Sequence, residues 1–480
     1  MLDLVIEQGE VVDGTGAPRM RADVGVKDGR IHQVGELSAV PARERVDARG
    51  RIVAPGFIDA HTHDDLLLLQ PPEGAHPKLT QGVTTAIVGN CGVSLAPLVS
   101  EREPPAPLNL LGRSHWRYAR FADYLDALDA AQPAINAACL VGHTTLRARH
   151  MDRFDRAATE DECALMAADL EHALQAGALG LSTGLFYPPA RAATAAEVIA
   201  AGAPLREHGG LVAMHIRDES DGIDEALREA LRIGRELEVQ TVLSHHKLVG
   251  LRNHGRSRET LALIDEAART QPVCLDCYPY TASSTMLLPG RTAQSSDVIV
   301  TWSGARPEAA GRSVFAMARE EGVTPEAMVE RLQPAGAIYF AMSDEDVDRI
   351  LAHPLTMVGS DGLAHDRRPH PRLWGTFPRV LGRYVRERGL FSLEQAVHKM
   401  TGLPARRFGL AGRGRIAPGC AADIVVFDAA HVAERASFDD PERPSTGIDA
   451  VYVNGQLACR QGETMNAHAG RVLRKGGAIA

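Results

Sequence analysis

Eight short apolar segments recur along the middle of the chain, and each stops at a polar residue or a glycine. Amphipathic helical patterns lie between most of them, at 121–131, 160–175, 194–208, 223–236 and 260–270. Buried strands that alternate with helices predict an α/β fold, a parallel TIM-like (β/α)8 barrel of about 250 residues plus insertions. The eight expected strands are 52–58, 83–88, 134–141, 177–185, 211–215, 241–245, 273–280 and 355–359.

The two ends of the chain have a different pattern, with short β-prone runs separated by Asp-Gly and Asn-Gly turns. These runs are 2–6, 10–12, 24–27, 31–34, 423–427 and 451–453. Neither end has enough strands to bury a face alone, so we expect both to pack together as one small β-sandwich. The predicted division is therefore sandwich 1–54, barrel 55–408 and sandwich 409–480. An inserted subdomain around 284–348, with helices near 307–321 and 325–331, interrupts the barrel.

Composition narrows the class of protein. The 480 residues include 52 Lys and Arg against 61 Asp and Glu, which gives a net charge of −9 and argues against nucleic-acid binding. No apolar run approaches the 18 residues or so of a membrane span, and the first residues carry acids where a signal peptide carries basic residues. Seven cysteines at irregular spacing do not suggest a disulfide framework. These features predict a cytoplasmic enzyme.

Candidate metal ligands follow the expected strands. In a barrel of this kind, functional residues lie where strands end at the carboxyl face. His61 and His63 are two residues apart after the first strand, so on an extended chain both side chains point to the same face. Similar residues follow four other strands. The complete set is His61, His63, Cys91, His215, His245 and Asp361.

Imidazole, thiolate and carboxylate donors together suit Zn²⁺, which keeps a position open for water in catalytic sites. Each residue alone has an ordinary structural explanation, because core histidines and buried cysteines are common. Their convergence on one barrel face favours a metal centre. The period-two rule directs His246 away from His245 and Lys247, toward the outside of the barrel. Cys274 and Cys277 lie three apart in a β-prone run, so they face opposite ways and are not expected to share a metal.

At this point the sequence resembles a known family. The segment PGFIDAHTH (55–63), the aspartate after the eighth strand and the split sandwich resemble the amidohydrolase superfamily of metal-dependent hydrolases. The motifs GNCG (89–92), SHHK (244–247), YPY (278–280) and GSDG (359–362) resemble its D-aminoacylases, or N-acyl-D-amino-acid deacylases. Cys91 is the specific feature, since most two-metal amidohydrolases have a carboxylated lysine where the D-aminoacylases have a cysteine.

The resemblance implies a metal arrangement and a mechanism. Cys91, His215 and His245 would form the tight zinc site, and His61, His63 and Asp361 would line a second position that is often empty or weakly filled in this family. Zinc acts as a Lewis acid and lowers the pKa of a bound water to about 7. Asp361 would accept the proton of the attacking water and deliver a proton to the departing amine. Tyr187 is a candidate for polarising the amide carbonyl.

The resemblance also implies how substrate binds. Lys247 and Tyr278 resemble the family's clamp for the substrate α-carboxylate, and Arg379 is a candidate third member. Arg372 and Arg379 both follow the eighth strand. Arg291 closes the segment that begins near Ser284 and leaves the seventh strand above the site. A guanidinium there could pair with a side-chain carboxylate, so we expect a small-molecule substrate, N-acyl-D-glutamate, and expect Ser284 to line its site.

Three alternatives stay open. The first is an N-acyl-D-amino-acid deacylase for hydrophobic or other D-residues. The second is a cyclic-amide hydrolase, although Cys91 and the pair Tyr278 and Lys247 speak against it. The third is a catalytically dead metal-binding barrel, which the presence of Asp361 disfavours. The preference for D-stereochemistry rests wholly on the resemblance, and acyl-chain length, the second metal and the oligomeric state are not determined.

Overall fold

The computed structural model describes every residue except 103, 113–114 and 477–480. The strands are β1 Leu2–Val11, β2 Met20–Lys27, β3 Arg30–Gly35, β4 Ala42–Asp47, β5 Ile52–Pro55, β6 Phe57–Asp59, β7 Val83–Val88, β8 Leu98–Val99, β9 Arg117–Tyr118, β10 Asn136–Cys139, β11 Val141–Gly142, β12 Gly180–Gly184, β13 Leu211–His215, β14 Gln240–Leu243, β15 Val273–Cys277, β16 Ala282–Met286, β17 Asp297–Ser303, β18 Ala335–Phe340, β19 Thr356–Val358, β20 Ile424–Phe427, β21 Ile448–Val453, β22 Gln456–Arg460 and β23 Glu463–Thr464. The α-helices are α1 Asp65–Leu69, α2 Phe121–Ala131, α3 His143–His150, α4 Glu160–Ala176, α5 Pro188–Arg191, α6 Ala195–Gly202, α7 Pro204–Glu207, α8 Ile223–Leu237, α9 Ser257–Ala268, α10 Val314–Glu321, α11 Pro325–Leu332, α12 Asp344–Ala352, α13 Arg372–Arg379, α14 Leu393–Met400 and α15 Gly402–Arg407, and a π-helix, Val380–Glu387, continues α13.

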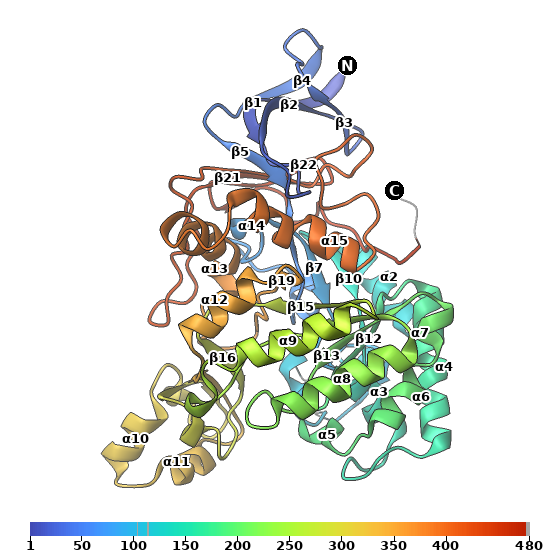
Figure 1. Cartoon of the computed structure of the whole chain (residues 1–480), viewed down its shortest axis with the longest axis vertical. Coiled ribbons are helices and arrows are strands. Elements are labelled where there is room, and N and C mark those ends of the chain that lie inside the picture. The colour runs from blue at the N-terminus through green and yellow to red at the C-terminus, as the bar shows by residue number, and fades with distance from the viewer. Residues whose placement is uncertain (103, 113–114, 477–480) are drawn as a thin grey trace.

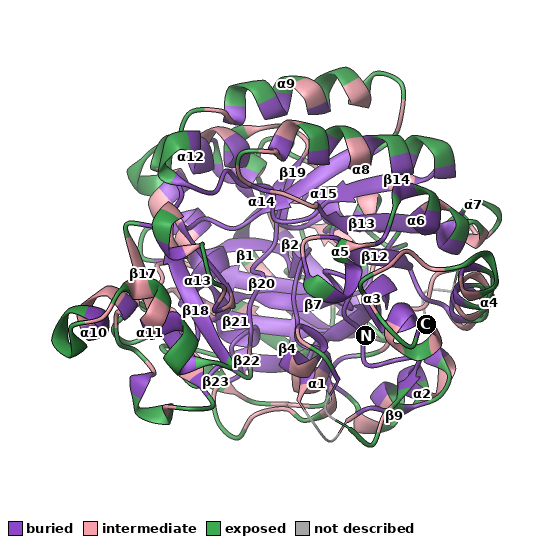
Figure 2. Cartoon of the chain, turned by 90° about the horizontal axis from the view of Figure 1, so that it is seen from below, coloured by how far each residue is buried: buried purple, intermediate pink, exposed green. Residues whose placement is uncertain are grey.

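The middle of the chain forms parallel sheet. The strand orders are β10-β7-β6 and β11-β12-β13-β14-β15-β19, and all pairs in both sheets are parallel. Only Leu140 separates β10 from β11, and the Ala60 amide donates to the Val358 carbonyl at 3.2 Å. Figure 2 shows these strands buried, whereas the helices around them are buried only on their inner faces. The predicted α/β fold is confirmed, and each of the eight expected segments overlaps at least one of these strands.

The first expected strand is two strands. The predicted segment 52–58 divides at Gly56 into β5, which pairs with β20, and β6, which pairs with β7. A Cβ on Gly56 would lie 2.2 Å from the Thr84 side chain, so the chain can cross from one sheet to the other there only as glycine. The crossing places His61 and His63 immediately after β6, at the edge where the candidate site forms.

Both ends of the chain contribute to one sheet of nine strands. Its order is β23-β22-β21-β20-β5-β1-β2-β3, with β4 paired to β1. β5 joins the two halves, because it runs antiparallel to β20 and parallel to β1. Figure 1 shows this sheet above the parallel strands, with the first strands in blue beside the last ones in red. Strands from the two ends of the chain therefore lie in one sheet.

The inserted segment contains a sheet that the sequence analysis missed. β16, β18 and β17 form three antiparallel strands, and α10 and α11 cover them at the lower left of Figure 1. These elements share a hydrophobic cluster of their own, which includes Val298, Met317 and Tyr339. The predicted helix 194–208 is likewise divided into α6 and α7, because Pro204 has no amide hydrogen to continue the first helix.

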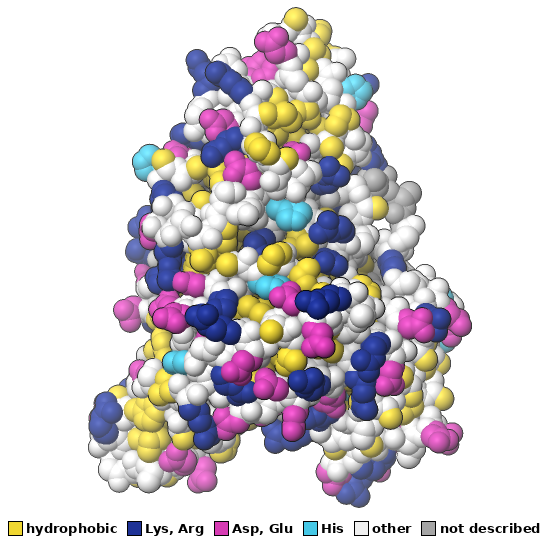
Figure 3. All heavy atoms as spheres, in the orientation of Figure 1, with side chains coloured by type: hydrophobic (Ala, Val, Ile, Leu, Met, Phe, Trp, Pro, Cys, Tyr) yellow, Lys and Arg dark blue, Asp and Glu magenta, His cyan; other side chains and the backbone are white. Residues whose placement is uncertain are grey.

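The charged side chains are distributed over the surface in Figure 3, and the cysteines are unpaired. On the face drawn there, basic and acidic side chains are interspersed rather than gathered by sign. Among the described residues, no helix combines the length and the apolar character that a membrane crossing requires. All seven cysteines are free, as expected from their spacing.

Candidate metal centre and active site

Three side chains of the expected metal-ligand set meet at the carboxyl ends of the parallel strands. Cys91 follows β7, His215 ends β13 and His245 lies just beyond β14. The Cys91 Sγ atom is 3.2 Å from His245 Nε2, which is 3.0 Å from His215 Nδ1. All three side chains are buried. A thiol and two ring nitrogens that point at one another in this way form a donor set suited to zinc.

The backbone is strained at this cluster. Cys91, His245 and Asp361 have φ values of 54°, 36° and 50°, in the left-handed region that residues with a Cβ rarely adopt. Such conformations persist where surrounding structure holds them and are concentrated at functional sites. His245 therefore does not continue the strand geometry assumed from the sequence. Its neighbour His246 nevertheless points outward, and its Nε2 lies 3.0 Å from Thr260 Oγ1 on α9.

A second group adjoins the first. His61 Nε2 lies 3.2 Å from Cys91 Sγ and 3.7 Å from Asp361 Oδ1, and His63 Nε2 lies 3.4 Å from the same carboxylate oxygen. Three overlapping sets have all their ligand atoms within 4.8 Å of one another. They are His61, His63 and Cys91; Cys91, His215 and His245; and His61, His245 and Asp361.

Burial controls the charge of these groups. It lowers the pKa of His61 to about 3 and the pKa values of His215 and His245 below their usual value, so the rings are neutral and have a free electron pair. Burial also raises the pKa of Cys91 well above its usual value. A metal ion that binds the thiolate must therefore displace a proton from this sulfur.

Asp361 is held ionised by an arginine. Burial alone would raise its pKa, but Arg372 and the histidines outweigh burial and hold the pKa of the carboxyl well below its usual range. Arg372 Nη1 lies 2.9 Å from Asp361 Oδ2. The Arg372 guanidinium also lies over the Tyr278 ring, 4.5 Å from its centroid, and donates to the Ser284 carbonyl.

The expected carboxylate clamp is only partly assembled. Lys247 Nζ lies 2.8 Å from His245 Nδ1 and 5.7 Å from the centroid of the Tyr278 ring, so Lys247 and Tyr278 adjoin the metal ligands. Arg379 does not join them. Its guanidinium pairs with Glu434 and donates to the Pro279 carbonyl, and this corrects the expectation that it completes the clamp. Arg379 lies seven positions, about two helical turns, beyond Arg372, and only the start of α13 approaches the site.

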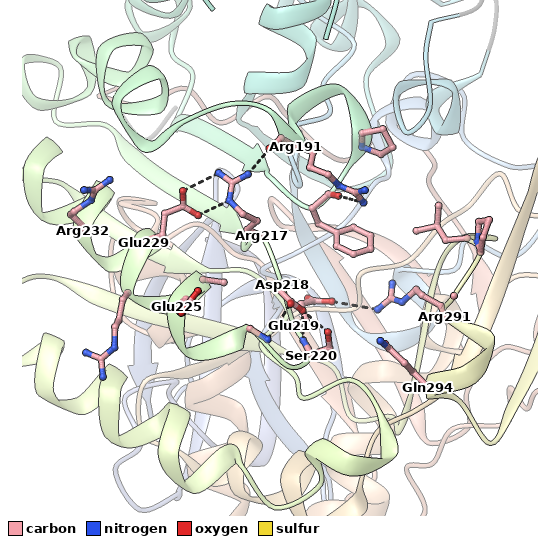
Figure 4. A pocket seen from close by; sticks show the side chains of 18 residues that line it. Arg191, Arg217, Asp218, Glu219, Ser220, Glu225, Glu229, Arg232, Arg291 and Gln294 are labelled. Carbon is pink, nitrogen blue, oxygen red and sulfur yellow. Dashed lines mark hydrogen bonds and ion pairs between the residues drawn. The ribbon is translucent and has the colours of Figure 1, made fainter. Parts of the chain in front are cut away.

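A cavity of about 1050 Å³ opens beside the metal ligands and is lined by loops after β12 and β13 and by the inserted segment. Figure 4 shows Arg291 and Glu219 facing each other across it. Arg291 Nη2 is 3.9 Å from Glu219 Oε2, and the guanidinium lies over the rings of Phe186 and Tyr339. Lys247 Nζ donates a hydrogen bond to Glu219 as well. Burial alone would raise the pKa of Glu219, but Lys247, His215 and His245 together outweigh burial and hold the pKa well below its usual range.

Tyr187, expected at the site, packs against the candidate ligand His215, whereas Ser284 accepts a hydrogen bond from Arg372 through its carbonyl. The Tyr187 ring packs edge-on against His215, 4.9 Å between centroids, and its hydroxyl lies 3.2 Å from Thr285 Oγ1. The Ser284 Oγ atom is buried and has no hydrogen-bond partner among the described residues.

Sequence analysis missed two acidic residues here. Asp276 Oδ2 lies 3.4 Å from His61 Nδ1, and Oδ1 accepts from the His245 amide. A carboxylate within the apolar run 273–277 was the available signal, since a buried strand rarely keeps an acid without a partner. Glu219 follows His215 by four residues in an irregular loop, where no periodicity predicts the direction of its side chain.

Comparison with known proteins places the chain in a class. A model described as "Amidohydrolase family" matches residues 44–271 and 295–458, so the chain belongs to the amidohydrolase family. Within that family it is 54% identical to D-aminoacylase of Alcaligenes xylosoxydans xylosoxydans over 474 residues, which cover 98% of each chain. It is 52% identical to the N-acyl-D-aspartate deacylase of the same organism, over 99% of this chain and 96% of that one.

A solved structure agrees with these relatives. N-acyl-D-glutamate deacylase from Bordetella bronchiseptica, in complex with zinc and a phosphonate inhibitor that mimics the tetrahedral intermediate, has a TM-score of 0.95. It is 50% identical and the match covers 98% of this chain and 99% of that one. The resemblance stated from the sequence motifs is thereby confirmed, and the chain has the TIM-barrel-type fold of the D-aminoacylases.

Proposed function

We propose that this chain is a zinc-dependent hydrolase of the amide bond in N-acyl-D-amino acids, with N-acyl-D-glutamate as its preferred substrate. The observation that carries the proposal is the convergence of Cys91, His215 and His245 beside the ionised carboxylate of Asp361. The activities named for the relatives support it, and the preference for D-stereochemistry rests on them alone.

The donor set fits zinc, because it combines a thiol with neutral imidazoles in a buried site. Cys91, His215 and His245 would hold the first ion, and His61, His63 and Asp361 would line a second position. When bound, zinc supplies Lewis acidity that polarises the amide carbonyl and makes water more acidic.

The proton transfers fall to Asp361. Its carboxylate takes a proton from the attacking water and returns a proton to the amine nitrogen as the amide bond breaks. Arg372 keeps Asp361 ionised before the attack, so that the base is ready at neutral pH. The Tyr187 hydroxyl donates to the carbonyl oxygen on which negative charge develops.

Recognition of the substrate needs cations for two carboxylates. Lys247 and Tyr278 bind the α-carboxylate beside the ligand His245. Arg291, at the cavity wall and backed by two aromatic rings, pairs with the side-chain carboxylate of glutamate. Ser284 contributes a hydroxyl that has no partner among the described residues. The aspartate side chain is one methylene shorter than that of glutamate. Because the two rings hold Arg291 in place, the longer glutamate side chain is the one expected to reach the guanidinium.

A hydrolysis screen tests the proposal. Purified protein with measured zinc content is assayed on the N-acetyl-D and N-acetyl-L forms of glutamate, aspartate and leucine, and on a hydantoin and dihydroorotate. We expect turnover of the D-forms with the highest kcat/KM for N-acetyl-D-glutamate. A preference for L-forms or for the cyclic amides would overturn the proposal. Zinc retention without any hydrolysis would favour the catalytically inactive barrel instead.

We also propose the finer architecture expected from the sequence. The parallel strands would close as a (β/α)8 barrel over 55–408, and this is supported by the parallel bridge between Thr62 and Gly362 that links the ends of β6 and β19. Residues 1–54 and 409–480 would form one β-sandwich, with 284–348 as the insertion. Limited proteolysis tests these boundaries, since cuts should fall first in exposed loops at the edges of the insertion.

A further inference from the structure

Glu219 is a buried carboxylate that touches both halves of the site. It lies in the loop between β13 and α8, and its backbone carbonyl accepts from the Val249 amide at 2.8 Å. Its Oε1 atom accepts a hydrogen bond from Lys247 and lies 3.1 Å from His245 Nδ1 and 3.8 Å from His215 Nε2. Its Oε2 atom lies 3.9 Å from Arg291. One carboxylate therefore contacts two metal-ligand rings and two cations.

The proton on His245 gives this carboxylate a defined task. The ring nitrogen that faces Cys91 and His215 is Nε2, so a metal ion held by this group would use the Nε2 electron pair. The single ring proton is then on Nδ1. Nδ1 lies 2.8 Å from the Lys247 ammonium, which is also a donor, so these two groups would oppose each other. Glu219 Oε1 is an acceptor within reach of both and removes the conflict.

The ring of His215 also lies near Glu219. His215 presents Nδ1 to His245, and its Nε2 has no hydrogen-bond partner among the described residues. The nearby acceptor for that nitrogen is again Glu219 Oε1. The non-ligand nitrogens of both imidazoles therefore lie near one oxygen, His245 Nδ1 at 3.1 Å and His215 Nε2 at 3.8 Å, and only the first is within hydrogen-bond length.

The opposite side of the carboxylate sets the positions of two cations. Lys247 is buried and hydrogen-bonded to Glu219, so the carboxylate helps to set the position of its ammonium. Arg291 faces the second carboxylate oxygen across the cavity in Figure 4. Because Glu219 contacts the metal-ligand rings as well, the distance from the metal ligands to both cations depends on this one side chain.

We infer that Glu219 is a positioning residue that couples the metal-ligand histidines His215 and His245 to the substrate-binding cations Lys247 and Arg291. The role of Glu219 toward Lys247 and Arg291 rests on the proposed function. Its role toward His215 and His245 rests on the geometry of the side chains alone. The carboxylate does not touch the reacting atoms. Its contribution is to fix the tautomer of the His245 ring and the positions of the two cations relative to the metal ligands.

The test compares Glu219→Gln and Glu219→Asp with Glu225→Gln, an identical change at an exposed glutamate that lines the same cavity. Zn²⁺ affinity is measured by competition with a chromogenic chelator, without substrate. We expect Glu219→Gln to lose roughly 10–100-fold in zinc affinity, as outer-shell carboxylates do. Glu219→Asp, which keeps the charge but withdraws it by one methylene, should fall in between, and Glu225→Gln should match the unmodified protein.

A second measurement follows the substrate half. With zinc saturating, Glu219→Gln should raise the KM for both N-acetyl-D-glutamate and N-acetyl-D-leucine roughly tenfold, because Lys247 binds the α-carboxylate of each, and should change kcat less. Zinc affinity and KM that both equal those of the Glu225→Gln control would overturn the inference, even if the melting temperature fell. If Glu219→Gln does not fold, unchanged zinc affinity in Glu219→Asp has the same meaning. Failure of the unmodified protein to hydrolyse either substrate would refute the proposed function and leave the zinc measurement to decide on Glu219.

Discussion

Arg372 and Asp361 form a buried ion pair, with Arg372 Nη1 2.9 Å from Asp361 Oδ2. Asp361 lies three residues after the end of β19, next to the candidate metal ligands. Because this guanidinium lowers the pKa of Asp361, Arg372→Met should raise that pKa. The carboxyl then takes up a proton at higher pH, so the low-pH limb of kcat/KM should move toward neutral pH. Loss of this buried ion pair should lower kcat/KM by roughly 10–100-fold. A pH profile with an unmoved acid limb would contradict this role for Arg372.

Asp361→Asn tests the proton carrier itself. Asparagine has nearly the same shape but cannot accept the proton of the attacking water, so turnover should fall by about 10²–10⁴-fold. The cluster of Cys91, His215 and His245 is not altered, so the zinc ion that these three side chains would hold should be retained after dialysis. Substantial activity in the zinc-loaded variant would reduce Asp361 to a bystander.

The sequence could bring the candidate metal ligands together because parallel strands all end at one edge of the sheet. His61, His215 and Asp361 are far apart in the chain, but each follows a buried strand, and the strand pattern alone places such residues together. Arg372 and Arg379 could not be distinguished in the same way. Both lie on α13, and the choice depends on how the helix is oriented against the strands, which no local pattern records.

The limits of the fold prediction have similar causes. The apolar run 52–58 is continuous in sequence, and only the strand pairing shows that its two parts belong to different sheets. The close approach of Thr84 to Gly56 marks the division. The strand β16, with the sequence ASSTM, has no apolar alternation to mark it, and it is held by pairing to β18 across a long separation in the chain. Glu219 lies in a loop whose path is set by the Val249 amide, a tertiary contact.

Arg291→Leu is expected to change selectivity. Loss of the guanidinium removes the partner of a side-chain carboxylate, so kcat/KM for N-acetyl-D-glutamate should fall by roughly 10²-fold, against a change below about threefold for N-acetyl-D-leucine. Arg191→Leu is the matched control, since Arg191 is an exposed arginine that lines the same cavity. Equal losses on the two substrates would reject Arg291 as the selecting residue.

Lys78 supports the loops that carry His61 and Asp361. Its buried Nζ lies 2.8 Å from Asp59 Oδ2 and 2.8 Å from Ser360 Oγ, and Asp59 in turn accepts from the Ser360 amide. Lys78→Met leaves the buried carboxylates of Asp59 and Asp64 without their partner, and the free energy of unfolding should fall by about 3–5 kcal/mol. Chemical denaturation measures this loss. Arg153→Met, which breaks a solvent-exposed pair with Asp155, should leave the transition unchanged.

Glu197 makes a pH-dependent contribution to stability away from the metal ligands. Burial would raise its pKa, but hydrogen bonds from His143 and Arg147 outweigh burial and lower the pKa to about 2, from 4.5 for an ordinary glutamate. A carboxyl whose pKa is lower in the folded state stabilises the fold above the unfolded pKa, and this stabilisation is lost as pH falls toward the folded pKa. Glu197→Gln should therefore destabilise the protein at pH 7, by up to about 3 kcal/mol.

The difference between the two proteins should shrink as pH falls below about 4.5, because only the unmodified protein loses this contribution there. Melting temperatures of both proteins, recorded from pH 7 to pH 3.5 at one zinc concentration, measure the gap. Glu266→Gln, at an exposed position of α9, is the control and should melt with the unmodified protein at every pH. A gap for Glu197→Gln that stays constant down to pH 3.5 would mean that packing, rather than the ionised carboxylate, accounts for the loss.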